Sequence, residues 1–145
     1  MKNLRKLLLF ILLLSALTCF IVSCGKAPKI EGYEWKMHSI SHVEDGRIVH
    51  DAVSDDNVLR QDAEIIDMRL IAKNGKITVT DLTNSKTYEG TYTVSDNNPK
   101  GTDYHIVLNG KAGYAGVAMT TYADGTKVPT LPITIDGYSI YFYAE

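Results

Sequence analysis

The chain lacks the residues and motifs that usually mark an enzyme or a metal-binding protein. Its 145 residues hold only two cysteines, Cys19 and Cys24, and none follows Cys24. A disulfide framework is therefore excluded for the rest of the chain. We find no Gly-x-Ser-x-Gly motif, no glycine-rich phosphate loop that opens a helix, and no calcium-loop spacing of acidic residues. The sequence therefore predicts neither a catalytic residue, nor a cofactor, nor a metal site.

Two histidines, His38 and His42, come closest to a metal-ligand pair. Their four-residue spacing would suit a helix, but the residues around them alternate as in a strand. On a strand this spacing spans about 13 Å, whereas zinc binds each imidazole at about 2.1 Å. We therefore interpret both histidines as half-exposed residues on the surface of a sheet.

Long apolar runs are also missing. The longest begins at Leu7 and ends at Val22, short of the about 20 residues that a membrane-spanning helix needs. Three basic residues precede it, and Ser23, Gly25 and Pro28 follow it. A positive start and a short apolar helix predict an export signal rather than a membrane span.

The end of that run, Ile21-Val22-Ser23-Cys24, resembles the lipobox of bacterial lipoproteins. The resemblance implies cleavage between Ser23 and Cys24, a diacylglycerol on the Cys24 sulfur, and a chain anchored to the cell membrane on its extracytoplasmic side. Residues 1–23 would be the signal peptide, 24–32 a lipidated tether and 33–145 the folded domain. The alternative is an ordinary cleavable signal, for which Ser23 is also a suitable cleavage residue.

Basic residues are scarce after the signal. The chain has 15 Lys and Arg against 17 Asp and Glu, and three of the basic residues precede Cys24. The excess of negative charge argues against nucleic acid as a partner and against a protein body that lies on an anionic membrane. About 120 residues suffice for one domain with its own core.

From Tyr33 onward, a period of two and abundant Val, Ile, Thr and Tyr predict an all-β domain. Asn74-Gly75, Asn109-Gly110 and Asp136-Gly137 are strong signals for two-residue hairpin turns. Pro129 and Pro132 favour an edge position, or an irregular start, for the seventh strand. The expected strands are Tyr33–Val43, Glu64–Ala72, Ile77–Thr80, Tyr88–Val94, Tyr104–Leu108, Gly113–Tyr122, Leu131–Ile135 and Tyr138–Ala144.

Eight strands joined by short turns predict an antiparallel up-and-down β-barrel, and a two-sheet β-sandwich is the alternative. The segment Ser95–Asp103 is expected to be a plain polar connection. The acidic segment Glu44–Ala63 is expected to be a long loop, with a short helix that begins near Ser54 or Asp55. Its position in the chain suits a lid over the barrel mouth.

A glycine and a tryptophan at the start of the first strand (Gly32 and Trp35), a long loop, and a meander with Glu89-Gly-Thr-Tyr-Thr-Val94 resemble the lipocalin-like domains of small bacterial lipoproteins. The resemblance implies a barrel that encloses a cavity. It covers the chain from Gly32 onward and implies no individual binding residue.

All nine tyrosines lie after Cys24. The outward Tyr141 and Tyr143 suggest a protein contact. We predict an envelope protein that binds a small apolar or amphipathic ligand, or alternatively an interaction or inhibitor protein with a filled barrel that contacts another envelope protein. Aromatic residues on inward faces are the candidate ligand-lining set, with core packing as the alternative role: Trp35, Tyr88, Tyr92, Tyr104 and Phe142.

Overall fold

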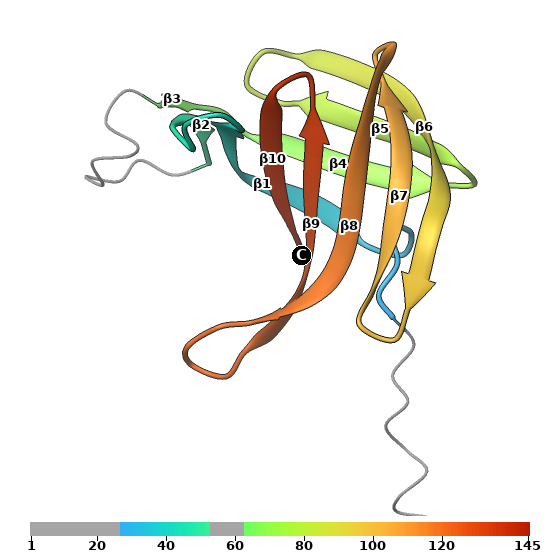
Figure 1. Cartoon of the computed structure of the whole chain (residues 1–145). Helices are drawn as coiled ribbons and strands as arrows, with labels where there is room; N and C mark the ends of the chain where they lie inside the picture. Colours follow the sequence, from blue (N-terminus) through green and yellow to red (C-terminus); the bar gives the residue numbers. More distant parts are fainter. Residues whose placement is uncertain (1–26, 53–62) are drawn as a thin grey trace, which may run out of the picture.

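The computed structural model describes residues 27–52 and 63–145, which form strands and no helix (Figure 1). The expected signal peptide, and the helix expected near Ser54 or Asp55, lie outside the described residues. The strands are β1 (Glu34–His42), β2 (Ile48–Asp51), β3 (Glu64–Ile65), β4 (Met68–Lys73), β5 (Lys76–Asp81), β6 (Lys86–Asn98), β7 (Gly101–Leu108), β8 (Lys111–Thr121), β9 (Lys127–Ile135) and β10 (Tyr138–Ala144).

Eight of these strands close into an antiparallel barrel, which confirms the predicted fold class. β4 to β10 pair in sequence order, β4 pairs with β1, and β10 returns to β1. The closing ladder runs from the pair Trp35–Ala144 to the pair His42–Tyr138. Because the sheet closes on itself, the two-sheet sandwich is excluded.

The short turns have the backbone geometry that their sequences predict. Both residues of Asn74-Gly75, Asn109-Gly110 and Asp136-Gly137 have positive φ, between 50° and 83°. Two consecutive residues with positive φ form the type I′ turn, whose twist matches that of the strands it joins. These turns make neighbours of β4 and β5, β7 and β8, and β9 and β10.

Of the two alternatives for the proline-containing strand, the edge position is wrong and the irregular start is confirmed. β9 lies inside the sheet, between β8 and β10. Its ladder with β8 skips from the pair Ala115–Ile133 to the pair Ala118–Thr130. Leu131 and Pro132 lie in this gap, and the barrel accommodates a proline without an open edge.

The segment after β1 is not one long loop. β2 lies within it, pairs with the second half of β1, and forms a short parallel ladder with β3. The expected strand Glu64–Ala72 is consequently split into β3 and β4. Ile66, between them, is 4% exposed, and its N–H donates to the carbonyl of Asp51 at 3.0 Å. This bond ties the β2–β3 ribbon to the barrel.

The segment Ser95–Asp103, expected as a plain connection, is mostly a continuation of the β6–β7 hairpin. The ladder resumes after an irregularity between Val94 and Asp96 and extends to the pair Asn98–Gly101. Thr102 is 1% exposed. Hairpin pairing therefore continues here despite the polar composition.

Two glycines allow strands to approach closely on the inward face. A Cβ at Gly90 would lie 2.0 Å from the carbonyl oxygen of Val107, and one at Gly113 would lie 2.5 Å from that of Thr134. Glycine in a strand often marks a tight bend at a barrel corner. β6 and β8 therefore bend at these positions as the sheet curves.

Candidate functional site

The end of the barrel where the chain enters is closed by Ile30. Its side chain is fully buried. Its N–H donates to the hydroxyl of Tyr104 at 3.0 Å, and its carbonyl accepts from Trp35 Nε1 at 2.8 Å. Both backbone groups of this residue are thus satisfied by side chains of the barrel, and Ile30 forms part of its floor.

Glu31 adds a second connection at this closed end. Its carboxylate accepts from the hydroxyl of Tyr92 and from the N–H of Asn74. These bonds, that of Tyr92 first, lower the pKa of Glu31. Burial, followed by the bond to Glu31, raises the pKa of Tyr92 to about 12. The Tyr92 ring also packs edge-on against Tyr104, with centroids 5.6 Å apart.

Four of the five aromatic residues expected to line a ligand site lie in this packed interior. Trp35 and Phe142 are fully buried, Tyr104 is 2% exposed and Tyr92 is 9% exposed. They belong to one continuous apolar core. None of the four lines the cavity at the other end of the barrel; the fifth residue, Tyr88, does.

That cavity occupies the barrel mouth and has a volume of ≈ 330 Å³. Its inner part is apolar, and its rim carries an imidazole, an amide, an ammonium and a carboxylate. A concave apolar surface with a few polar groups is typical of small-molecule sites. It is lined by Ile40, Val49, His50, Tyr88, Leu108, Asn109, Lys111, Ile135, Asp136, Tyr138 and Ile140.

Two of the hairpin turns supply much of the polar rim. Asn109 and Asp136 are the first residues of their type I′ turns. Lys111 Nζ lies 3.3 Å from an Asp136 carboxylate oxygen, and both side chains are about 60% exposed (62% and 60%). An ion pair this exposed contributes little to stability. A ligand can therefore displace it at little cost.

β2 contributes the side of the mouth that sequence reasoning missed. Val49 and His50 line the cavity from this strand, and His50 Nδ1 lies 3.4 Å from a carboxylate oxygen of Glu64 in β3. The sequence signal for this strand was the β-branched pair Ile48-Val49 within an acidic segment. Two residues are too few to show the alternation that identifies a strand.

The structure places His38 and His42 on β1, both half-buried. The His38 ring lies edge-on to Tyr141 and Tyr143, at centroid distances of 6.0 and 6.4 Å, and the His42 ring packs on Tyr138 at 4.8 Å. In the part of the chain that the structure describes, no three His, Cys, Asp or Glu residues are arranged to hold a metal ion.

Tyr141 and Tyr143 lie on the outer wall, as expected, beside Tyr122 from the β8–β9 hairpin. Burial and the two neighbouring phenols raise the pKa of Tyr122. By the alternation of side chains, Asp103 is the one charged residue that points outward from the described strands β7 to β10. This half of the wall, formed by the outward faces of β7 to β10 and called the tyrosine wall, also carries Tyr114, which is 65% exposed.

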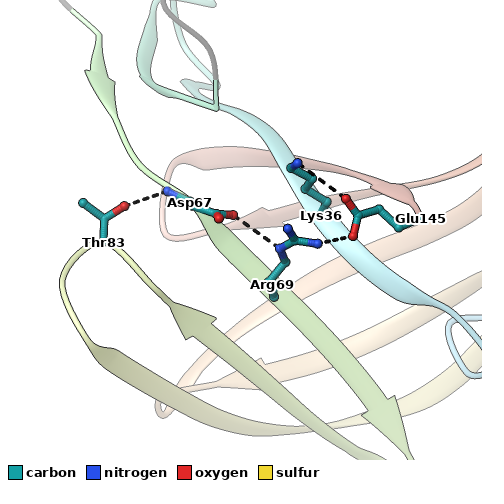
Figure 2. A network of polar contacts seen from close by, with 5 residues as sticks. All are labelled: Lys36, Asp67, Arg69, Thr83 and Glu145. Atoms are coloured by element: carbon teal, nitrogen blue, oxygen red, sulfur yellow. Dashed lines mark hydrogen bonds and ion pairs between the residues drawn. The ribbon is translucent and has the colours of Figure 1, made fainter.

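The adjoining part of the outer wall, where β1 and β4 follow β10 around the barrel, carries charged residues. Figure 2 shows Arg69 between Asp67 and Glu145, with Lys36 3.4 Å from Glu145. Arg69 lowers the pKa of Glu145 through their hydrogen bond. The network crosses the shortest seam of the barrel, where β1 and β4 share only three residue pairs. Its position indicates a structural role.

Two other hollows, of ≈ 370 and ≈ 500 Å³, lie on the outer wall along β4, β5 and β6. Exposed Lys, Thr, Asn and Glu side chains make up much of their lining, so they are grooves between surface side chains. The mouth cavity differs because core side chains form its lining. Although its volume is smaller, it is the better candidate site.

The described residues, 27–52 and 63–145, contain no helix that is long and apolar enough to cross a membrane. No protein-family model matches the chain, and neither a curated protein nor a solved structure matches it significantly. The functional interpretation therefore depends on the barrel and its mouth alone.

Proposed function

We propose that this chain is a lipid-anchored protein of the cell envelope that holds a small apolar or amphipathic ligand in its barrel mouth. The observation that carries the proposal is the mouth cavity, with Ile40, Leu108 and Ile140 inside and Lys111 and Asp136 at the rim. Such a surface suits a ligand with an apolar body and a polar head. The closed end supports the same choice, because its side chains are packed.

The volume sets the size of the ligand. A cavity of ≈ 330 Å³ lies at the small end of the range for ligand sites, about 300–1,000 Å³. At roughly 30 Å³ for each non-hydrogen atom, the volume of a liquid water molecule, it holds on the order of ten such atoms. A medium-chain fatty acid or a small aromatic compound fits, whereas a long-chain lipid would leave part of its tail outside.

Titration calorimetry tests the mouth, with decanoate added to the soluble chain that begins at Gly25. Ile140→Trp, which fills the cavity, should weaken binding by at least tenfold. Ile71→Trp is the matched control, because Ile71 lies on the outer wall and is 55% exposed. Equal binding by both variants, or no binding by the parent chain, would contradict the proposal. Native mass spectrometry of the same chain would identify a ligand that co-purifies.

The anchor is supported by the sequence Ile21-Val22-Ser23-Cys24. Cys24→Ser should move the protein from the membrane fraction to the soluble fraction, because the thioether to diacylglycerol cannot form. Cys19→Ser is the matched control and should remain with the membrane. Unchanged fractionation of Cys24→Ser would contradict the anchor without bearing on the mouth.

The tyrosine wall favours a second function, contact with another envelope protein. Tyr141, Tyr143 and Tyr114 offer rigid rings with polar tips, which suit protein interfaces. Crosslinking the full chain in the envelope should capture a partner, and Tyr141→Lys should abolish the capture. Thr78→Lys, on the outward side of β5, is the control. Capture that is equal in both variants would argue against this surface.

A further inference from the structure

We infer that the barrel mouth opens away from the membrane that holds the anchor, so that its ligand enters from the aqueous phase. The inference depends on the proposed anchor at Cys24 and on the proposed mouth site. It goes beyond both, because neither one determines from which side the ligand arrives. Its basis is the point where the N-terminal segment joins the barrel.

That point is the closed end. Ile30 is held there by hydrogen bonds to Trp35 and Tyr104, and Glu31 by bonds to Tyr92 and Asn74. In Figure 1 the described residues that precede β1, drawn in blue, lie near the β6–β7 hairpin turn. The residues of the mouth cavity lie at the opposite ends of the same strands, at the β7–β8 and β9–β10 turns.

The length of the tether decides the orientation. From Cys24 to Ile30 is a step of six residues, which spans about 22 Å at most in any conformation. Eight tilted strands about 4.8 Å apart form a barrel with a backbone radius of about 7 to 8 Å. A chain that runs from Ile30 in the barrel floor to the outer surface of the wall must therefore cover about 10 Å.

The chain would then have to run back along the outside of the barrel. Even the short wall formed by β4 and β5, with 6 residues each, adds about 15 Å with its turn, and the wall along β6, with 13 residues, adds about 30 Å. The path to the mouth is therefore at least about 25 Å, close to the full extension of the tether. To hold the mouth against the bilayer, a lipid on Cys24 would need a fully extended tether that follows the shortest wall, whereas the closed end is reached without extension.

This geometry identifies the source of the ligand. A mouth that faced the bilayer could take an amphiphile directly from the lipid. A mouth held on the far side of the barrel takes its ligand from solution, either as a dissolved molecule or from a soluble carrier. The modest size of the cavity agrees with a ligand small enough to dissolve in water.

The test measures which end of the barrel lies near the membrane. The full chain, produced in a bacterium that processes lipoproteins, is reconstituted in vesicles that contain a lipid with a fluorescent acceptor on its head group. Lys100→Cys at the closed end and Lys111→Cys at the mouth each receive a donor dye. We expect several-fold stronger energy transfer from position 100. Equal transfer, or stronger transfer from position 111, would overturn the inference.

Two controls separate this inference from the proposals beneath it. A flexible insert of twelve Gly and Ser residues after Gly25 should remove most of the difference between the two positions, because the tether then reaches the mouth. A persistent difference would show that the tether does not set the orientation. If the chain does not sediment with the vesicles, the proposed anchor is overturned, and the orientation with it. The mouth site is tested separately, by decanoate binding.

Discussion

Tyr104→Phe tests whether Ile30 is an integral part of the barrel floor. The substitution keeps the ring that packs on Tyr92 but removes the hydroxyl that accepts the N–H of Ile30 at 3.0 Å. Because Ile30 is fully buried and Tyr104 is 2% exposed, the N–H has no access to water. A buried donor left without its acceptor costs about 1–3 kcal/mol.

The expected change in thermal stability follows from that energy. A domain of this size loses about 4 °C in Tm for each kcal/mol. Tyr104→Phe should therefore lower the Tm of the chain that begins at Gly25 by about 4 to 12 °C. Circular dichroism measures the Tm, and amide hydrogen exchange shows whether the Ile30 N–H has lost its protection.

The matched control is Tyr114→Phe, which removes a hydroxyl from a side chain that is 65% exposed. Its effect on stability should stay within about 0.5 kcal/mol, as is usual for surface substitutions. Wild-type Tm and slow exchange of the Ile30 amide in Tyr104→Phe would refute the assignment of this bond. The tether would then lack the fixed point on which the orientation depends.

Two further predictions concern the pair Glu31–Tyr92 and the glycine bends. The bonds to Tyr92 and Asn74 lower the folded-state pKa of Glu31 from 4.5, so this stabilisation is present above about pH 4.5 and is lost as the pH falls through the folded pKa. The pKa of Tyr92 rises from 10.0 to about 12 on folding, so the free energy of unfolding should also decrease as the pH rises between these two values. Urea denaturation measures both pH dependences, and Tyr92→Phe should make each of them smaller. A pH dependence equal to that of the parent chain would contradict the assignment. Gly90→Ala should cost about 2–3 kcal/mol, since its Cβ would lie 2.0 Å from backbone. Gly116→Ala should cost less in the same assay, because its Cβ would meet only the Asp103 side chain, at 3.0 Å, and equal costs would argue against the bend at Gly90.

The barrel was predictable because its local signals agree. Three Asn-Gly and Asp-Gly turns adopt the geometry that their residues favour, and the alternating pattern identifies the inward faces. The irregular positions were harder to predict. Pro132 lies inside the sheet because one gap in a ladder is enough to accommodate it, and β2 is only four residues long.

The position of the site was less predictable than the fold. A period of two tells which face of a strand a residue occupies, but not its depth along the barrel, which depends on the tilt and stagger of the strands. Tyr88 and Tyr92 share one face of β6, yet Tyr88 lines the mouth and Tyr92 contacts Glu31 at the closed end. Ile30 was missed because a single apolar residue in a short tether has no period.

The closing ladder between β1 and β10 has a consequence for how the protein is made. The first strand of the barrel to leave the ribosome pairs along its length with the last, and its early contact with β4 comprises three residue pairs. Nearly the whole domain must therefore be available before β1 has its full set of partners. Pairing between the two ends of a domain is slow to form. We expect barrel closure to follow synthesis of β10. The chain would then stay unfolded while it is being made, which suits the export signal that we propose.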